Sequence, residues 1–232
     1  MDKTTPVYKE LRKFINTSWG SVGKDGTFPP FFPGPQPISI ERRHMNLLNR
    51  NEYFACEKTD GTRIALVCCT IDGKKLAVTV NRAMEMERVT FCFPRGTFDG
   101  TILDGEMVTA HDGSTYLMLY DAVIVSGQDL RNMNLMDRLS AIDRFANGVM
   151  RVPSDAFQIK LKKFYYMKHM KYLVEMLKNN EFSYATDGVV FTPVYEPIRI
   201  GTHDTMFKWK PQEKNTVDFK VKNRPNGEIG LY

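Results

Sequence analysis

The sequence has few cysteines and no metal-binding spacing of cysteine or histidine. Its four cysteines are Cys56, Cys68, Cys69 and Cys92, and no two of them form a C-x-x-C pair. The four histidines are scattered, and none forms a metal motif with its neighbours. These patterns argue against a structural zinc site. They predict reduced, buried thiols in an intracellular compartment, either the nucleus or the cytoplasm.

Long apolar runs are also missing. No stretch approaches the roughly 18 apolar residues of a membrane-spanning helix, and the N-terminus lacks the apolar core of a signal peptide, so no membrane partner is expected. The chain has 232 residues, of which 42% are hydrophobic and 25% charged, an ordinary globular composition. Its formal net charge of +5 mildly favours an anionic partner such as a nucleotide or a nucleic acid.

Strand patterns dominate what the sequence does contain. Short helices are predicted at residues 6–16 and near Arg42 to Arg50, and an extended proline-rich arm is predicted at 28–37. The following strands are predicted: 53–56, 64–71, 75–81, 89–93, 102–110, 116–125, 188–193, 205–210 and 216–221. Amphipathic helices are predicted over 134–150 and 168–179. The sum predicts an α+β domain of antiparallel β-sheets flanked by helices.

A charged stretch, Glu57 to Arg63, joins the first two of these strands and contains Lys58. A lysine amine has a reference pKa near 10.4, so holding it neutral at pH 7 costs about 4–5 kcal/mol. Partial burial and neighbouring cations can supply that shift. Gly61 would let the backbone approach a ligand closely, and Arg63 offers a planar donor fork for phosphate or ribose oxygens. Taken alone, the stretch is also consistent with a charged β-turn.

Four further groups of polar residues lie at the ends of predicted strands. Glu106 could hold a ribose hydroxyl or a metal, and Tyr120 could stack on a purine. Asp187 offers the hard oxygen ligands that suit Mg²⁺ or Mn²⁺ bridging to phosphates. Lys208 and Lys210 share one strand face, where they would clamp a phosphate and lower the pKa of a nearby lysine. A surface turn is the alternative for the group that contains Glu106, and each group taken alone is a weak signal.

Together, the ordered motifs K-x-D-G-x-R, D-G-E, aromatic-Asp, D-G-V-V-F and K-W-K-P resemble the covalent nucleotidyltransferase superfamily. That superfamily holds mRNA capping guanylyltransferases and ATP-dependent polynucleotide ligases. The finer similarity is to the capping enzymes, above all those of large DNA viruses such as the chlorella virus enzyme. It is carried by residues 33–42, 120–127 and 215–219. The resemblance implies that Lys58 attacks the α-phosphate of GTP and that GMP passes to a 5′-diphosphate RNA end, giving a GpppN cap.

The resemblance also implies a set of site residues. The nucleotide-binding set is Thr59, Asp60, Gly61, Arg63, Arg82, Glu106, Tyr120, Ser126, Lys162, Asp187, Lys208, Lys210 and Asp218.

Within that set, Arg63 and Glu106 match ribose-binding residues, and Arg82 matches a phosphate-binding arginine. Lys208 and Lys210 match the α-phosphate lysines, and no specific role is assigned to Asp218. Asp187 and Glu106 are the candidate ligands for Mg²⁺ or Mn²⁺.

Base recognition is assigned by the resemblance to three of these residues. Tyr120 matches the aromatic residue that stacks on guanine, and Ser126 and Lys162 match contacts to guanine O6. A lysine can only donate, so it favours the guanine carbonyl over the adenine amino group. Lys160, two residues away, is the alternative to Lys162.

Two domains are expected: residues 1–217 as the nucleotidyltransferase domain and residues 218–232 as the beginning of an OB-fold. The relatives continue into a complete OB-fold that closes over GTP. We therefore expect either a truncated molecule, which we favour, or a lid supplied by a partner. RNA triphosphatase or methyltransferase activities on other chains are further suggested partners. The alternatives are an ATP-dependent RNA or DNA ligase and a non-catalytic nucleotide- or RNA-binding module.

Overall fold

The computed structural model describes residues 1–214, 221–223 and 229–231. Its α-helices are α1 (Pro6–Trp19), α2 (Met45–Arg50), α3 (Leu135–Gly148) and α4 (Met170–Lys178). Its first strands are β1 (Gln36–Ser39), β2 (Tyr53–Thr59), β3 (Thr62–Ile71), β4 (Lys74–Asn81), β5 (Met86–Arg88), β6 (Thr101–Thr109) and β7 (Thr115–Val125). The later strands are β8 (Gln128–Asp129), β9 (Gln158–Leu161), β10 (Tyr165–Tyr166), β11 (Thr186–Pro193), β12 (Thr202–Trp209), β13 (Val221–Asn223) and β14 (Ile229–Leu231).

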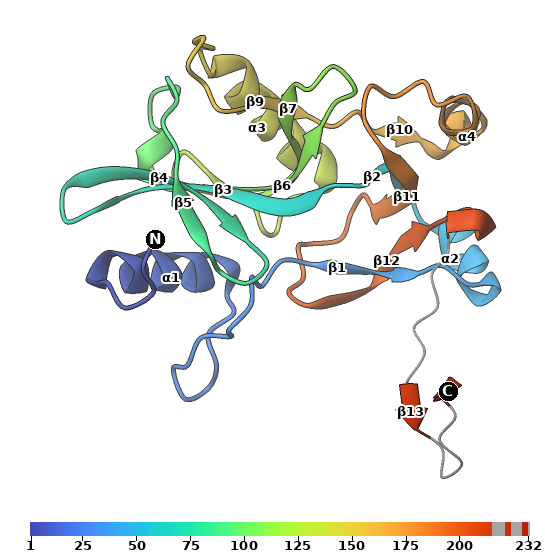
Figure 1. Cartoon of the computed structure of the whole chain (residues 1–232), viewed down its shortest axis with the longest axis horizontal. Coiled ribbons are helices and arrows are strands. Elements are labelled where there is room, and N and C mark those ends of the chain that lie inside the picture. Colours follow the sequence, from blue (N-terminus) through green and yellow to red (C-terminus); the bar gives the residue numbers. More distant parts are fainter. Residues whose placement is uncertain (215–220, 224–228, 232) are drawn as a thin grey trace.

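Two β-sheets form the body of the described chain (Figure 1). One has five strands in the order β1-β12-β11-β2-β10. The other has seven strands, ordered β5-β4-β3-β6-β7-β8, with β9 pairing beside β7. Most neighbours are antiparallel, although β1 pairs parallel to β12 and β9 parallel to β7. The fold is therefore the predicted α+β arrangement of antiparallel sheets flanked by helices.

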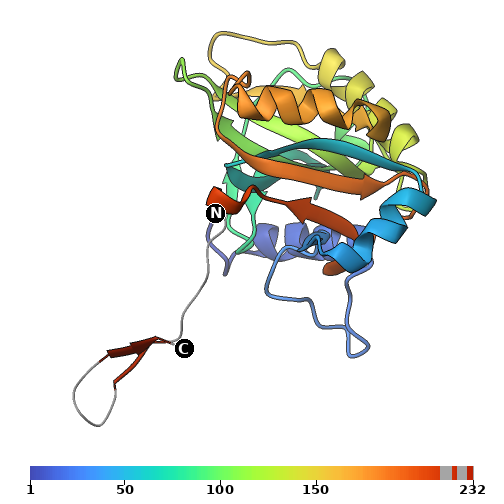
Figure 2. The ribbon, with the colours of Figure 1, turned by 90° about the vertical axis from the view of Figure 1, so that its right-hand side faces the viewer.

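Helices cover both faces of the seven-stranded sheet, because its central strands are apolar on both sides. Ala65, Val67 and Cys69 of β3 pack into a core shared with α1. The alternate residues Leu66 and Cys68 pack into a second core shared with α3. Successive side chains of a strand point to opposite faces, so a continuous apolar run needs two covering layers. Figure 2 shows α1 and α3 on opposite sides of the sheets.

The α1 helix begins and ends at residues suited to those positions. The Thr5 side chain accepts a hydrogen bond from the Tyr8 N–H, Pro6 occupies the first turn, and Gly20 ends the helix in the left-handed conformation. Its buried face includes Leu11 and Ile15. The predicted helix at 6–16 is confirmed, and it continues to Trp19.

The five-stranded sheet has its own core. Leu48 of α2 and Leu173 of α4 pack with buried aromatic residues of β2, β11 and β12, namely Tyr53, Phe191 and Phe207. Each sheet is thus stabilised by its own helices. Polar side chains from both sheets lie in the region where the two sheets meet.

The chain passes from one sheet to the other at Asp60 and Gly61, between β2 and β3. A Cβ atom added at Gly61 would collide with the main-chain oxygen of Met107 in β6. Only glycine therefore allows the crossing to run so close to the neighbouring strand. Lys58 lies inside β2 rather than in the turn, because β2 continues past the predicted end at Cys56.

The structure departs from the sequence-based prediction between residues 89 and 93. The edge strand β5 ends at Arg88, and only a single bridge links Cys92 to Met150. Phe91 and Phe93 instead pack against other aromatic rings, with centroids 4.9 Å from Phe157 for Phe91 and 6.1 Å from Phe145 for Phe93. Burial of these rings in the α3 core replaces strand pairing here.

The C-terminal predictions are only partly covered by the described residues. Asp218, the expected boundary at 217/218 and most of the predicted strand at 216–221 lie outside them. Within them, β13 and β14 pair with each other as an antiparallel hairpin. Among the described helices, none has both the length and the apolar character required to cross a bilayer.

Candidate active site

A cavity of about 170 Å³ lies where the two sheets meet. The five-stranded sheet contributes Cys56, Lys58, Val190, Thr192 and Met206 to its wall. The seven-stranded sheet contributes Arg63, Glu106, Tyr120 and Asp121, and the remaining residues are Pro35, Pro37, Lys162 and Phe164. Residues far apart in the sequence are therefore brought together. Five of the predicted site residues line the cavity, namely Lys58, Arg63, Glu106, Tyr120 and Lys162. Asp187 lies beside it, as the hydrogen-bond partner of Lys58.

Asp187 holds two lysines beside this cavity: Lys58, which lines it, and Lys210, which lines a neighbouring hollow together with Asp187. Lys58 Nζ donates to Asp187 Oδ1 at 2.8 Å, and Lys210 Nζ contacts Asp187 Oδ2 at 2.6 Å. The Lys58 and Lys210 side chains are 24% and 30% exposed, so both amines remain reachable from solvent. We expected cations around Lys58 to keep its amine neutral. In this arrangement its direct partner is a carboxylate, with Lys210 on the carboxylate's other oxygen.

The electrostatics of Asp187 follow from these contacts. Burial raises the pKa of its carboxyl, but hydrogen bonds from Lys210 and Lys58 outweigh burial, and the net pKa is lowered. The backbone beside it is specialised, because Gly188 lies opposite Lys58 at a register shift and has φ +152°. A Cβ atom at Gly188 would collide with the main-chain oxygen of Trp209. Glycine at this position therefore allows β11 to present Asp187 to both lysines.

A second polar group joins Arg63, Asp104 and Tyr120. Arg63 donates to Asp104 from Nε at 3.1 Å and from Nη2 at 2.5 Å, and its Nη1 donates to the Pro35 carbonyl at 2.7 Å. The Tyr120 hydroxyl donates to Asp104 Oδ1 at 3.0 Å. Asp104 is fully buried, and burial raises the pKa of the Tyr120 hydroxyl well above its ordinary value. Tyr120 is thus a neutral ring fixed in place by a buried carboxylate.

A third group runs from Lys162 through Thr59 to Glu106. Lys162 is 4% exposed, and its Nζ donates to the Glu57 carbonyl at 2.8 Å and to Thr59 Oγ1 at 3.0 Å. The Thr59 hydroxyl in turn donates to Glu106 Oε2. Lys162 Nζ lies 6.0 Å from the centroid of the Tyr120 ring. Lys160, by contrast, is exposed and lies over Tyr116, so Lys162 is the lysine that faces the cavity.

Three predicted residues lie at the rim or beside the cavity. Arg82 is exposed, and its Nη2 donates to Gln36 Oε1 at 3.2 Å, between the two cavity-lining prolines of the arm. Lys208 shares its face of β12 with Met206, a cavity residue. Asp60 is exposed and lines a neighbouring hollow of about 590 Å³, together with Asp187 and Lys210.

Ser126 is not brought into the site. It follows the last residue of β7, has φ +49°, and donates its N–H to Thr101 Oγ1 at 3.0 Å. It lines a separate hollow against α3, together with Pro94 and Phe145. The motif placed Ser126 near Tyr120 in sequence, but the extended strand carries it away from the cavity. Its expected contact with guanine O6 stays a prediction, which its position outside this cavity does not support.

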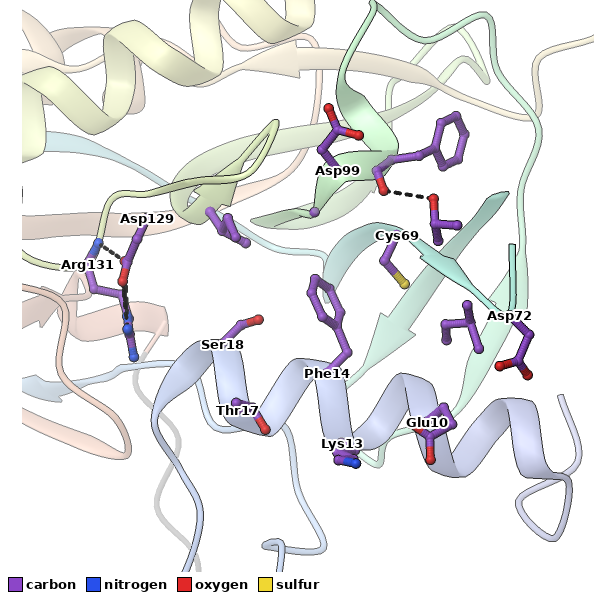
Figure 3. Close-up of a pocket in the computed structure, with 15 residues that line it drawn as sticks. Glu10, Lys13, Phe14, Thr17, Ser18, Cys69, Asp72, Asp99, Asp129 and Arg131 are labelled. Carbon is purple, nitrogen blue, oxygen red and sulfur yellow. Dashed lines mark hydrogen bonds and ion pairs between the residues drawn. The ribbon is translucent and has the colours of Figure 1, made fainter. Parts of the chain in front are cut away.

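A larger hollow of about 840 Å³ lies elsewhere, between α1, the end of β3 and the segment from Phe98 to Gly100, with Asp129 and Arg131 at one side (Figure 3). Phe14 lies near its centre in Figure 3, and Asp129 and Arg131 form an ion pair. None of the predicted site residues lines it.

The sequence-based reasoning assigned no role to Glu57, Asp104 or Tyr184. Glu57 and Asp104 are buried carboxylates, 1% and 0% exposed, and the Tyr184 hydroxyl donates to Glu57 Oε1 at 3.0 Å. Both carboxylates interrupt apolar strand residues, Cys56 before Glu57 and Leu103 before Asp104. An acidic residue inside such a run is the signal that could have identified them, because charged groups are rarely buried without a partner.

The predicted metal ligands Glu106 and Asp187 are each already engaged, by Thr59 and by the two lysines. Among the described residues there is no cluster of three or more histidine, cysteine or acidic side chains suited to a metal ion. Mg²⁺ usually binds one or two carboxylates together with substrate phosphates and water. Asp187 fits that mode, since release of one lysine would free an oxygen beside the cavity.

Solved structures with a similar fold include a mycobacterial DNA ligase D complexed with ATP and MES. That structure has a TM-score of 0.53 and 12% identity, and the match covers 77% of this chain and 60% of that one. A protein named Pmar-Lig_Pre has a TM-score of 0.54 and 15% identity, with 81% and 48% covered. The chain thus shares its fold with a class of proteins that includes a DNA ligase.

Sequence comparison narrows this class to one family. The family model described as "mRNA capping enzyme, catalytic domain" matches residues 1–212, and the chain belongs to that family. The "mRNA-capping enzyme subunit alpha" of Saccharomyces cerevisiae is 31% identical over 224 residues, covering 82% of this chain and 48% of the yeast protein. The "mRNA-capping enzyme" of Danio rerio is 31% identical over 221 residues, covering 86% and 36%. The chain therefore spans about half or less of these relatives, and the finer similarity to viral enzymes stays a prediction.

Proposed function

We propose that this chain is the guanylyltransferase part of an mRNA capping enzyme. The observation that supports the proposal most is the Lys58–Asp187–Lys210 group beside a cavity lined by Tyr120 and Lys162. It places a reachable amine and an aromatic surface on one small cavity, with the second cation, Lys210, on the neighbouring hollow. Membership in the capping enzyme family adds the reaction class to this geometry.

In the proposed reaction, Lys58 Nζ attacks the α-phosphorus of GTP. A phosphorus–nitrogen bond forms, the bond to the β-phosphate oxygen breaks, and pyrophosphate leaves. A terminal phosphate oxygen of a 5′-diphosphate RNA then attacks the same phosphorus, which releases the Lys58 amine and forms the GpppN end. Such phosphoryl transfers depend mainly on positioning and charge neutralisation, so no dedicated histidine base is required.

Before attack, the Lys58 amine must leave its ion pair and lose a proton. Asp187, at 2.8 Å, is its partner in the ion pair, and Lys210 holds the other carboxylate oxygen. A bound triphosphate would compete with Asp187 for both lysines. Mg²⁺ or Mn²⁺, held by the Asp187 oxygen so released, would supply further neutralisation of phosphate charge. Lys208 and Arg82 are proposed to complete the phosphate contacts at the rim.

Base and sugar recognition are proposed for the buried end of the cavity. Tyr120 would stack on guanine, and Lys162 would donate to its O6 oxygen. Hydrogen bonds account for two of the three Nζ protons of Lys162 among the described residues, which leaves one for a ligand. Arg63 and Glu106 would contact the ribose, although each already has a protein partner there.

The proposal places the chain within a longer reaction sequence. A 5′-diphosphate RNA end must be supplied by a triphosphatase, and the cap is completed by a methyltransferase, both proposed to act from other chains or domains. We further propose that residues 218–232 begin an OB-fold domain, in keeping with the greater length of the relatives. An intracellular site of action, in the nucleus or cytoplasm, agrees with four free cysteines, although Cys92 is exposed rather than buried.

The deciding experiment is incubation with α-labelled GTP or ATP and a divalent ion, followed by denaturing electrophoresis and intact-mass measurement. We expect label from GTP and a mass increase of one GMP group. Label from ATP alone would favour the ligase-type alternative suggested by the structural neighbours. Tight GTP binding without an acid-labile adduct would favour a non-catalytic binding module.

A further inference from the structure

A buried carboxylate lies directly behind the lysine that faces the nucleotide cavity. Glu57 precedes Lys58 in β2, and strand alternation turns its side chain away from the face that carries Cys56 and Lys58. Its Oε1 lies 3.7 Å from Lys162 Nζ, and both side chains are almost fully buried, at 1% and 3% exposure. Two opposite charges therefore face each other in the interior, one residue from the proposed nucleophile.

Tyr184 fixes this carboxylate from the other side. Its hydroxyl donates to Glu57 Oε1 at 3.0 Å. Glu57 Oε2 is buried and has no hydrogen-bond partner among the described residues. Burial raises the pKa of the Glu57 carboxyl, and the Lys162 ammonium opposes that shift. Removing charges from water costs several kcal/mol per ion, so an incompletely satisfied buried pair is poorly explained by stability alone.

The geometry of Lys162 shows what the pair can do. Two of its Nζ–H groups are fixed, on the Glu57 carbonyl and on Thr59 Oγ1, and Thr59 in turn donates to Glu106. A tetrahedral ammonium with two fixed protons has a defined direction for the third. The Glu57 carboxylate, 3.7 Å from Nζ, attracts this amine and helps to hold it in place.

We propose that Glu57, held by Tyr184, is a positioning residue for base selection, because its buried carboxylate holds the Lys162 amine in place at the cavity wall. This inference rests on the proposed function, in which Lys162 meets the C6 substituent of the base. A carbonyl at C6 accepts a hydrogen bond from the third N–H of Lys162. An amino group at C6 is itself a donor, so it cannot accept this hydrogen bond. A buried donor left without an acceptor rejects the wrong ligand strongly, so the position of the Lys162 amine sets the discrimination.

The test compares three nucleotides on the 232-residue chain. GTP and ITP both carry a carbonyl at C6, and ATP carries an amino group. Comparing their dissociation constants therefore separates recognition of the C6 group from contacts to the rest of the nucleotide. The variants are Glu57→Gln, which keeps the shape and removes the charge, and Tyr184→Phe, which removes one hydrogen bond. The matched control is Glu52→Gln, an exposed carboxylate just before β2. Thermal unfolding of each variant checks that it is folded.

We expect Glu57→Gln to weaken GTP and ITP binding alike by about tenfold and to change ATP binding by less than about twofold, as for loss of a charge-assisted hydrogen bond. Tyr184→Phe should shift the GTP-to-ATP ratio in the same direction by about twofold to threefold. Glu52→Gln should leave the ratio unchanged. These results together would support the inference.

Two outcomes would overturn it. Equal weakening of all three nucleotides would show that Glu57 only supports the cavity wall, and an unchanged GTP-to-ATP ratio in a folded Glu57→Gln variant would show that its charge is irrelevant. Should Glu57→Gln not fold, the ratio measured for Tyr184→Phe decides in the same way. If the unsubstituted chain binds ATP more tightly than GTP, the proposed function is overturned. If the unsubstituted chain prefers GTP and the Glu57→Gln variant prefers it to the same extent, only this inference is overturned.

Discussion

The two hollows at opposite ends of β3 differ in size and in chemistry, one lined by Arg63 at its start and the other by Cys69 near its end. The hollow beside α1 has about 840 Å³, and the cavity beside Lys58 about 170 Å³. Charges in the larger one are exposed, as in the Asp129–Arg131 pair at 50% and 34%. Charges in and behind the smaller one are largely withdrawn from water, with Lys162, Glu57 and Asp104 at 3%, 1% and 0%.

This difference shows that size is a poor guide to the site. Exposed ion pairs contribute little free energy and need no explanation by function. Buried ionised groups are costly unless their geometry is well satisfied, and they concentrate where proteins bind or transform ligands. The smaller cavity is therefore the better candidate, and the comparison between the two hollows can be tested directly.

The largest effect is expected at Lys58. Lys58→Ala and Lys58→Arg should both abolish the covalent GMP adduct, because alanine has no amine and the guanidinium of arginine stays protonated. Intact-mass measurement after incubation with GTP and a divalent ion gives the readout. Lys13→Ala, in the larger hollow, is the control and should form the adduct normally. An undiminished adduct in either Lys58 variant would remove the smaller cavity from consideration.

A smaller effect is expected at Tyr120. Tyr120→Ala should weaken GTP binding by about 1–3 kcal/mol if the ring stacks on the base. Tyr120→Phe keeps the ring and loses only the hydroxyl bond to Asp104, so it should cost about 0.5–1.5 kcal/mol or less. Titration calorimetry measures both. A dissociation constant for the alanine variant equal to that of the original chain contradicts stacking.

Asp187 should make stability depend on pH. Its folded pKa is lowered below the ordinary value of 3.8 because Lys210 and Lys58 outweigh burial. The carboxylate therefore stabilises the fold above pH 3.8, and this contribution is lost as the pH falls through the lower folded pKa. Asp187→Asn should lower the free energy of unfolding by about 1 kcal/mol at pH 7, since the pair is partly exposed.

Denaturant unfolding at several pH values measures this difference. The gap between Asp187→Asn and the original chain should close as the pH approaches and passes below 3.8. Glu181→Gln, an exposed carboxylate on the loop before β11, serves as the control with no such gap. A gap that stays constant from neutral to acid pH would show that charge on Asp187 does not stabilise the fold.

The smallest effect is expected in the larger hollow. Arg131→Gln breaks the exposed pair with Asp129 and should change the free energy of unfolding by less than about 0.5 kcal/mol. Adduct formation with GTP should be unchanged. A loss of adduct comparable to that of the Lys58 variants would reverse the ranking of the two hollows.

Local patterns predicted much of the fold. The amphipathic spacing identified α1, and Asp72 and Gly73, both with positive φ, form the predicted hairpin turn between β3 and β4. Pairing between distant strands was beyond the same patterns. Alternation cannot show that β2 and β3 join different sheets, or that β1, inside the proline-rich arm, pairs with β12. Those contacts depend on long-range packing rather than on local preference.

The candidate site was predictable to a similar extent. The ordered motifs predicted Lys58, Asp187 and Lys210 as a group, and the structure brings them into contact. The motifs did not show how far the extended strand carries Ser126 from Tyr120, so Ser126 was expected at a cavity that it does not line. They also gave no partner for Lys58, and its direct contact with a carboxylate was not anticipated. Roles for these residues stay proposals until the adduct is measured.

The two-residue crossing at Asp60 and Gly61 gives the cavity a mechanical property. Lys58 belongs to one sheet, while Glu106 and Tyr120 belong to the other, so the nucleophile and the nucleoside contacts sit on separate rigid walls. If one sheet shifts relative to the other, the distance between Lys58 and the nucleoside contacts changes even when all side chains keep their rotamers. Gly61, packed against the backbone of β6, lies at the point where the chain joins these two walls.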